Sequence, residues 1–531
     1  MARPNALRPA WNILALATGL WAAPASAVWG PDSVLTIGSA GTGTVPIFSG
    51  FLPTGGSDLY VVWRWFPGSA GVTSLSRVTA DGGLAFARTL DSAGLPGVGP
   101  DGLGGLIDAW SVNGDIAFRH VTATGSSEPA PPQNYWAAQT PDLDHFPAVA
   151  PDSAGVVYIG WTDQQGTFVV QRVTAAGGRA PGWPALGRRL TPAATSGMLP
   201  DGSGGAYVLF QTDRARALRV LADTTLAPGW PAEGIPLESA ASMAARYAVS
   251  PSLVRSSADR TFAVWTEGVS VFTNSQRIMV QSFDGAGQLA WAELDLTSFV
   301  SSVADLSAQP DGQDGLLLSW YQLAAFEVAH VLADRTVAAG PFVASPSGLG
   351  ALAPSRNGGF IAFGASPSGI LATWYLADGS LDPSEPVNPR LVHPQVPGQP
   401  SYPVAAWSDG DGGALLVFDE ETHPSSHEER MRHVFRAGLL DAFRPSHLAL
   451  SLAPNPARTE LTLELAFPTN ALARLELLDV SGRRLLSRSM AGSPATRRER
   501  LDLPVGIAPG LYLVRVTQGA ASRVQRFAVF N

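Results

Sequence analysis

The sequence contains no cysteine, so disulfide bonds, cysteine-ligated zinc or iron–sulfur sites and a cysteine nucleophile are all excluded. It also contains no lysine, and all 35 basic residues are arginine. Charged residues make up only 15% of the chain, whereas 45% of the residues are hydrophobic and glycine (56) and proline (43) are abundant. This composition argues against wholesale disorder and is typical of many short apolar strands joined by turns.

Negative charge prevails but is unevenly distributed. The formal net charge is −9, yet residues 448–531 hold eleven arginines against six acidic residues, so the preceding part is more acidic than the total. An acidic body argues against nucleic acid as a partner. A length of 531 residues also exceeds one ordinary core, which predicts at least two domains or a repeat array.

The amino end has the order of a secretory signal. Arg3 and Arg8 precede an apolar run from Trp11 to Ala23, and Ala25-Ser26-Ala27 follows as a small-residue cleavage site. The alternative, a membrane anchor, is disfavoured because the run is short, and no other stretch approaches the ~20 apolar residues of a spanning helix. We therefore expect cleavage before Val28 and no membrane span in the mature chain.

A turn, a short apolar strand and an aromatic residue recur along the chain, as in Pro200–Phe210. The turns carry Asp and Gly, as in Asp201-Gly202-Ser203-Gly204-Gly205, because a tight hairpin needs positive φ angles. Intervals of 43 to 55 residues predict β-propeller blades of about four strands each. The eight copies end at Trp63, Trp110, Trp161, Phe210, Trp265, Trp320, Phe363 and Phe418.

Other repeat architectures fit less well. A helical solenoid would need long segments of 3.6-residue periodicity, and a tandem immunoglobulin array would need ~100 residues per domain. Eight copies predict eight blades, with seven as the alternative because the first and seventh copies are weaker. Trp29–Leu35 resembles a fourth blade strand, and the last unit, Val404–Phe443, has no obvious fourth strand. We therefore expect the amino-terminal strand to complete the last blade and close the ring.

After Pro445 the pattern changes to that of a small antiparallel β-sandwich. Its strands are expected at Leu461–Leu465, Ala473–Val480, Gly510–Val516 and Gln525–Phe530.

Three motifs of this segment occur in order: Pro454-Asn455-Pro456, Leu477–Arg483 and Gly510–Val514. They resemble the type A carboxyl-terminal sorting domain of type IX secretion cargo, and the related Ig-like domain of flagellar hook-capping proteins is similar. The resemblance implies export across an outer membrane, with the domain removed or used for surface attachment. Family members usually carry lysine near the end, where this chain has Arg523 and Arg526. The repeat unit is itself similar to propeller repeats found beside such sorting domains.

Three groups of polar residues are candidate sites. The run from Asp419 to His433 holds three of the eight histidines and suits a metal or acid–base site, but we favour a long solvated hairpin loop between two strands of the last blade. Asp142-Leu143-Asp144 and Asp409-Gly410-Asp411-Gly412-Gly413 invite a calcium interpretation, yet each lacks a full ligand set and is better explained by turn chemistry.

The third group recurs just after the strand aromatic: Asp163, Asp213 and Asp419. These residues form either a ring of carboxylates around one face or a set of hairpin caps, and we favour the caps. The repeated tryptophans could stack on sugars, but their fixed register favours core packing between blades.

We therefore predict an all-β chain with a signal peptide at 1–27, a β-propeller at 28–445 and an Ig-like sorting domain at 446–531. No catalytic, cofactor-binding or metal-binding residue is assigned, and no cofactor is expected. The favoured function is a secreted or cell-surface, outer-membrane-associated propeller that binds an extracellular glycan or protein without catalysis. Its other expected partner is the secretion machinery, through residues 446–531. The alternatives are a secreted hydrolase or lyase acting on polysaccharide and a structural scaffold without a discrete ligand.

Overall fold

The computed structural model describes residues 34–530 apart from short gaps, so the expected signal peptide at 1–27 lies outside the described residues. The chain divides into two compact units, Val34–Val434 and Phe435–Asn531, which are described separately below. The one helical element in the described part of the chain is a single 3-10 turn, Arg356–Gly358. No described helix has the length and apolar character needed to cross a membrane. The gaps are residues 41–46, 55–57, 66–71, 80–82, 91–96, 131–132, 141–142, 154, 193, 212–213, 240–246, 269–274, 299, 302, 346–348, 424–425, 437–448, 454–455, 467–471, 491–495, 505 and 520.

The first unit consists of eight antiparallel sheets, which we call blades 1 to 8 in the order of their innermost strands. The innermost strands are β2 (Ile47–Pro53), β6 (Gly97–Pro100), β11 (His145–Ser153), β15 (Ala194–Pro200), β19 (Tyr247–Arg255), β24 (Val303–Pro310), β28 (Gly350–Pro354) and β32 (Ser401–Ser408). The second strands are β3 (Leu59–Trp65), β7 (Leu106–Val112), β12 (Val156–Thr162), β16 (Ala206–Gln211), β20 (Thr261–Gly268), β25 (Leu316–Gln322), β29 (Phe360–Ser366) and β33 (Ala414–His423).

The third strands are β4 (Val72–Val78), β8 (Asp115–Val121), β13 (Thr167–Thr174), β17 (Ala215–Val220), β21 (Ser275–Phe283), β26 (Ala325–Val331), β30 (Gly369–Tyr375) and β34 (Ser426–Val434). The outer strands are β5 (Leu84–Thr89), β10 (Tyr135–Ala138), β14 (Arg188–Pro192), β18 (Ile235–Pro236), β22 (Leu294–Asp295), β27 (Val337–Ser345), β31 (Arg390–Pro394) and, in blade 8, β1 (Val34–Ala40). Two short strands, β9 (Ser127–Glu128) and β23 (Val300–Ser301), pair with β8 and β21.

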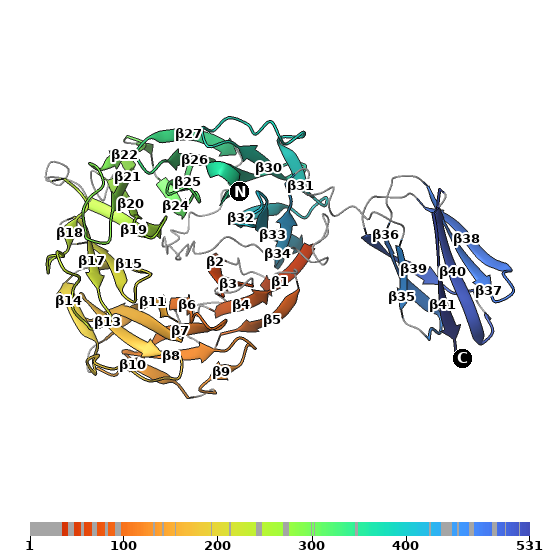
Figure 1. Cartoon of the computed structure of the whole chain (residues 1–531), viewed down its shortest axis with the longest axis horizontal. Helices are drawn as coiled ribbons and strands as arrows, with labels where there is room; N and C mark the ends of the chain where they lie inside the picture. The colour runs from red at the N-terminus through yellow and green to blue at the C-terminus, as the bar shows by residue number, and fades with distance from the viewer. Residues whose placement is uncertain are drawn as a thin grey trace. The chain divides into compact units, whose positions relative to one another are not determined.

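These blades form a closed ring. Each innermost strand contacts the innermost strand of the next blade, and β32 of blade 8 contacts β2 of blade 1. Blade 8 is completed by β1, which pairs antiparallel with β34 from Val34 opposite Arg432 to Ala40 opposite His427. Figure 1 shows red β1 beside blue β34 at this seam. The prediction of an eight-bladed propeller closed by its amino-terminal strand is confirmed, although the strand begins at Val34, and Trp29 lies outside the described residues.

The eight recurring aromatics all lie in second strands, and all are buried. Those of blades 3 to 8 belong to hydrophobic clusters that join neighbouring blades. One cluster, for example, packs Ile107 and Phe118 of blade 2 against Ile159 and Trp161 of blade 3. The prediction that these aromatics pack between blades is therefore confirmed, and burial of whole indole rings supplies much of the hydrophobic stabilisation of the ring.

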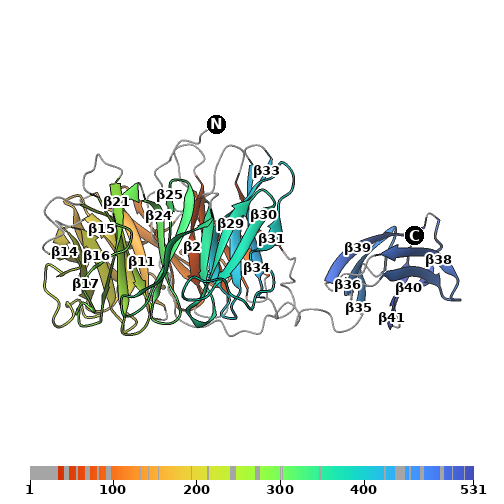
Figure 2. The same cartoon turned by 90° about the horizontal axis from the view of Figure 1, so that it is seen from above.

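The antiparallel order of each blade gives the ring two different faces. The turns from the first to the second strand, and from the third to the fourth, lie on one face, which we call the turn face. The hairpins from the second to the third strand, and the loops that lead to the next blade, lie on the opposite face, which we call the link face. Figure 2 shows the blade strands running between the two faces.

The second unit contains two packed sheets. One has the order β35 (Ala449–Ala453), β36 (Glu460–Ala466), β39 (Thr496–Asp502), and the other has the order β38 (Arg484–Met490), β37 (Ala473–Asp479), β40 (Gly510–Gln518), β41 (Ala521–Val529). Side chains from both sheets, such as Leu463 and Val514, share one buried core. The four predicted strands correspond to β36, β37, β40 and β41. The Ig-like character and the boundary at 446 stay predictions.

Candidate functional site

The Asp-Gly turns of the turn face are held by side-chain caps. In each of four turns the aspartate Oδ1 accepts hydrogen bonds of 2.6–2.9 Å from the backbone N–H groups two and four residues later. The capping residues are Asp101, Asp201, Asp311 and Asp409. The prediction that these residues serve turn geometry is confirmed, with one correction for blade 8. In blade 8 the capping residue is Asp409. Asp411 stands two residues after it and donates its N–H to the cap, as Ser203 does in the blade 4 turn.

The four capping aspartates, together with Asp58 of blade 1 and Asp152 of blade 3, are tied to the third strand of their own blade. The second carboxylate oxygen meets an arginine or histidine side chain at 2.6–2.9 Å. These contacts bind the inner turn to the outer half of the sheet, so they serve the fold. Six such pairs lie among the described residues: Asp58–Arg77, Asp101–His120, Asp152–Arg172, Asp201–Arg219, Asp311–His330 and Asp409–His433.

The blade 2 pair shows the electrostatic effect of this arrangement. Burial alone would raise the pKa of Asp101, but hydrogen bonds from His120 and from the N–H groups of Leu103 and Gly105 outweigh it and lower the pKa. The hydrogen bond to Asp101 raises the pKa of His120, with a smaller contribution from Glu128. The negative charge of Asp101 and the positive charge of His120 thus stabilise each other.

The link face repeats a different ion pair in three blades. A buried carboxylate two residues after the second-strand aromatic meets an arginine: Asp163 meets Arg189 at 2.5 Å, Glu267 meets Arg277 at 2.5 Å and Glu420 meets Arg430 at 2.8 Å. The arginines come from β14, β21 and β34. The sequence singles out Asp163 as a hairpin cap and Glu420 as part of the polar run from Asp419 to His433, but Glu267 is in neither group, although it too stands two residues after its aromatic.

The three aspartates proposed as caps or as a carboxylate ring have different outcomes. Asp163 is a cap, because its Oδ1 accepts hydrogen bonds from the N–H groups of Gln165 (2.9 Å) and Thr167 (2.8 Å). Asp419 is not a cap. It lies within β33 and both of its carboxylate oxygens meet Nδ1 of His427, at 2.9 and 3.0 Å. Asp213 lies outside the described residues.

The polar run from Asp419 to His433 forms strands, which corrects the predicted solvated loop. Three of its polar side chains are buried: Glu420, His427 and Glu429. Burial of such groups is tolerated because polar side chains pair across the β33–β34 hairpin and with the neighbouring blade. His393 of β31, for example, places Nε2 3.2 Å from Oε1 of Glu420. Burial lowers the pKa of His393, against the opposing effect of Glu420. Within the described part of the chain, no three histidine or acidic side chains gather closely enough to hold a metal ion.

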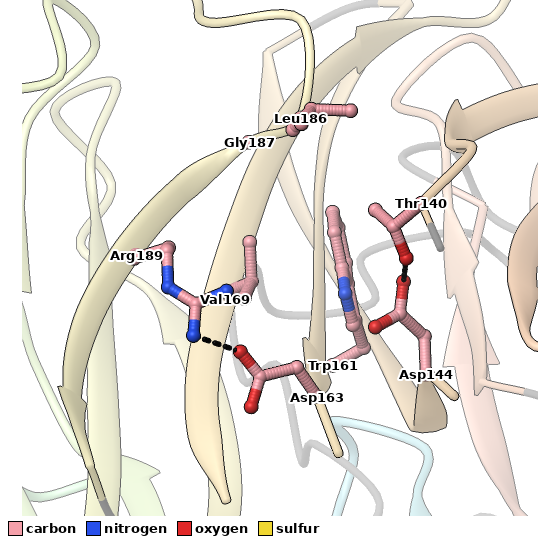
Figure 3. A pocket seen from close by; sticks show the side chains of 8 residues that line it. All are labelled: Thr140, Asp144, Trp161, Asp163, Val169, Leu186, Gly187 and Arg189. Carbon is pink, nitrogen blue, oxygen red and sulfur yellow. Dashed lines mark hydrogen bonds and ion pairs between the residues drawn. The ribbon is translucent and has the colours of Figure 1, made fainter. Parts of the chain in front are cut away.

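A small cavity opens at the link face between blades 2 and 3. Its volume is about 220 Å³. Figure 3 shows the Trp161 ring edge-on between two polar pairs. On one side Thr140 Oγ1 donates a 3.0 Å hydrogen bond to Asp144 Oδ2, and on the other side Arg189 meets Asp163. The walls are completed by Val169, Leu186 and Gly187.

The link that carries Thr140 and Asp144 is fixed to the adjacent hairpin of blade 2. Asp144 donates its N–H to the carbonyl of Gly114 (2.9 Å), and its own carbonyl accepts a hydrogen bond of 2.6 Å from Ser111 Oγ. The Thr140 N–H donates to Asp115 Oδ1 at 2.8 Å. This side of the cavity is therefore held in place by backbone hydrogen bonds.

Trp161, in the wall of the cavity, carries an unsatisfied donor. Its side chain is completely buried, and its indole N–H has no hydrogen-bond partner among the described residues. Leaving a buried donor unpaired costs about 1–3 kcal/mol. Trp265, at the same position in blade 5, also has an unpartnered indole N–H within the described part of the chain.

From the sequence, Trp161 is predicted to be a core aromatic, Asp163 a hairpin cap and Asp144 part of an incomplete calcium motif. The other residue of that motif, Asp142, lies outside the described residues. Thr140 and Arg189 could not be predicted as cavity residues, because only the fold brings the blade 2 link beside β14. The segment after Trp110 supplies Thr140 and Asp144, but its interval of 51 residues lies within the range of the other copies and gave no signal.

The carboxyl-terminal domain matches a known family. Residues 451–529 match the secretion system C-terminal sorting domain, which confirms the type IX resemblance. The chain is therefore a secreted propeller protein, and the sorting domain indicates engagement of the secretion machinery and association with the cell surface or outer membrane. Arg523 and Arg526 of this domain are exposed on β41.

No curated protein matches this chain, and several solved structures resemble it at low sequence identity. A mutant of puromycin hydrolase is 16% identical, with 70% of this chain and 58% of that chain covered and a TM-score of 0.37. Virginiamycin B lyase from Staphylococcus aureus is 11% identical, with coverage of 75% and 98% and a TM-score of 0.36. PorZ, a surface component of the type-IX secretion system of Porphyromonas gingivalis, is 10% identical, with coverage of 91% and 87% and a TM-score of 0.19. With TM-scores this low, these likenesses carry no functional argument.

Proposed function

We propose that the propeller binds an extracellular glycan or protein through its link face and catalyses no reaction. The observation that carries this proposal is the contrast between the two faces. The turn face repeats a capping aspartate that meets a third-strand arginine or histidine, as at Asp201 and Asp311. The link face differs between blades and contains the cavity beside Trp161. Binding sites commonly lie where loops vary on a rigid scaffold.

The pairing of the link-face acids supports binding over catalysis. Asp163, Glu267 and Glu420 are each buried and each ion-paired with an arginine. Such pairs neutralise buried charge and fix side-chain positions. A general acid or base instead needs a carboxylate that can exchange its proton near the operating pH.

A polysaccharide hydrolase or lyase is the second candidate, favoured by one observation. Two carboxylates, Asp144 and Asp163, line the same cavity. Glycoside hydrolases use two carboxylates on either side of the scissile bond. The Glu238 carboxyl adds a second feature to this face, because burial and the nearby Glu267 raise its pKa against the hydrogen bond from the Ala215 N–H.

The secreted full-length protein can be tested for binding and turnover together. It would be applied to a glycan array and to immobilised extracellular proteins, and each retained polysaccharide would then be incubated with it and assayed for new chain ends. We expect saturable retention without product. Release of oligosaccharide that stops in Asp163→Asn would establish the enzyme instead, and absence of retention on every surface would contradict the binding function.

A further inference from the structure

We propose that the cavity beside Trp161 takes a single neutral sugar residue and recognises its hydroxyl groups. The inference rests on the proposed binding function of the link face and names the ligand class for one of its sites. It is carried by the chemistry of the lining side chains, which present hydrogen-bond donors and acceptors side by side around a small apolar-walled space.

The unpaired donor of Trp161 calls for a ligand acceptor. The indole N–H can only donate, and it finds no partner among the described residues. The two carboxylates that line the same cavity, Asp144 and Asp163, are acceptors when ionised. A ligand that satisfies both sides must therefore donate and accept within a few ångströms. A hydroxyl group does both, and a sugar ring carries several hydroxyl groups on neighbouring carbons.

Charge excludes the simpler alternatives. An anion would approach two carboxylates, Asp144 and Asp163, in a cavity lining that holds one basic side chain, Arg189. A primary ammonium would suit the carboxylates, but it has no acceptor to offer the Trp161 N–H. A neutral polyol avoids both conflicts, and the side chains of Val169 and Leu186 provide apolar walls for the C–H edges of its ring.

The size of the cavity sets the length of the ligand. A volume of about 220 Å³ holds roughly seven water molecules at ~30 Å³ each. Pockets for drug-sized ligands begin at about 300 Å³. The space thus suits one sugar residue at the end or side of a glycan chain, with the remainder of the glycan outside the cavity.

Blade 5 provides an internal control for this inference. Trp265 occupies the position of Trp161 and has the same unpartnered indole N–H within the described residues. The acid after it, Glu267, meets Arg277, which also meets Asp295 at 2.6 Å, so a three-membered charge network takes the place of the single pair in blade 3. Replacing Trp265 makes the same chemical change as replacing Trp161, at a site for which we propose no sugar.

The experiment uses the full-length secreted protein and the methyl glycosides of glucose, galactose and mannose as probes. Binding would be followed by saturation-transfer NMR, and dissociation constants would be obtained by titration. Trp161→Phe removes the N–H and keeps most of the ring, and Asp144→Asn tests the opposite wall. Trp265→Phe is the matched control, and thermal unfolding verifies that each variant is folded.

We expect at least one glycoside to bind, with Kd raised roughly five- to tenfold in Trp161→Phe, the effect of one lost hydrogen bond. Kd in Trp265→Phe should equal that of the unaltered protein. Equal affinity in Trp161→Phe would overturn the inference, as would an equal loss in both tryptophan variants. Failure of every glycoside to bind would also overturn it, and retention of another ligand on the arrays would show that the binding function itself survives.

Discussion

The turn face and the link face are built from the same blades but use their polar residues differently. On the turn face, an aspartate meets a third-strand arginine or histidine in six blades among the described residues, and in four of them it also caps the turn. On the link face, blades place different groups at matching positions: Asp163 in blade 3 meets Arg189 of β14, whereas Glu267 in blade 5 meets Arg277 of β21. Repetition on one face indicates a structural requirement, and variation on the other indicates freedom for recognition.

The difference also has a packing cause. A turn between the two innermost strands lies where blades converge, so its geometry is constrained in every blade. The Cβ of an alanine at Gly205, for example, would stand 2.5 Å from the carboxylate of Asp201 and 2.6 Å from the carbonyl of Val220. The link-face hairpins are less constrained, and in blade 8 the hairpin extends into the long strands β33 and β34.

The largest effect is expected when the ring on which both faces depend is opened. Deleting Val34–Ala40 removes β1, exposes the edge of β34 and leaves blade 8 with three strands. We expect the loss of most of the free energy of unfolding, which is about 5–15 kcal/mol for a typical domain. Denaturant unfolding of the full-length chain measures it, and an unchanged midpoint would contradict closure by β1.

A point substitution tests the same seam without removing residues. A Cβ added at Gly38 of β1 would overlap the Trp63 ring of blade 1, so Gly38→Ala should destabilise the ring by about 1–3 kcal/mol. A Cβ added at Gly197 of β15 would meet open space, so Gly197→Ala is the matched control. Similar losses in both variants would show that the seam is not special.

An effect smaller than that of opening the ring, but larger than that of Gly38→Ala, is expected from breaking one turn-face pair. Asp201→Ala removes the acceptor of the Ser203 and Gly205 N–H groups and leaves Arg219 without its carboxylate. Because the aspartate side chain is buried, we expect a loss of about 3–5 kcal/mol in thermal or chemical unfolding. Asp223→Ala, an exposed cap in the same blade, should cost much less, and equal losses would contradict the structural role of the buried pair.

The smallest effect is a pair of opposite pH dependences. The pKa of His120 is raised, so its contribution to stability is complete below the ordinary value of ~6.5 and is lost as pH rises through the folded-state pKa. The pKa of His393 is lowered, so its contribution is complete above ~6.5 and is lost as pH falls toward the folded-state pKa.

Unfolding free energies of His120→Gln and His393→Gln, measured from pH 5 to 9, test these signs. The stability difference between the unaltered protein and His120→Gln should shrink as pH rises, whereas the difference for His393→Gln should grow. Asp101 and Glu128 face His120, and Glu420, Arg430 and Arg432 act on His393, so both histidines keep charged neighbours over this range. Parallel slopes for the two variants would contradict the contrast between their sites.

Much of the fold follows from local sequence. The Asp-Gly turns and the second-strand aromatics are short-range signals, so eight blades could be predicted from their recurrence. Ring closure could be predicted because Trp29–Leu35 resembles a fourth strand and the last unit lacks one. The run from Asp419 to His433 could not be read in this way. Its polar residues look solvated along the chain, and only pairing across β33 and β34 and with His393 of blade 7 explains their burial.

The cavity was harder to predict for the same reason. Thr140 and Asp144 follow β10, and Arg189 lies in β14, so about 50 residues separate the two sides that meet at Trp161. The sequence contains the Trp161 side chain but gives no sign that its N–H is unpartnered. That property depends on the whole of the surrounding packing between blades 2 and 3.

The most direct test of the account compares the two faces in one binding experiment. Asp144→Asn on the link face and Asp201→Asn on the turn face make the same chemical change, and both would be titrated at a temperature where both are folded, with the ligand retained in the array screen. The account predicts that Asp144→Asn weakens binding while Asp201→Asn lowers only the unfolding temperature. Weakened binding in Asp201→Asn with full affinity in Asp144→Asn would contradict it.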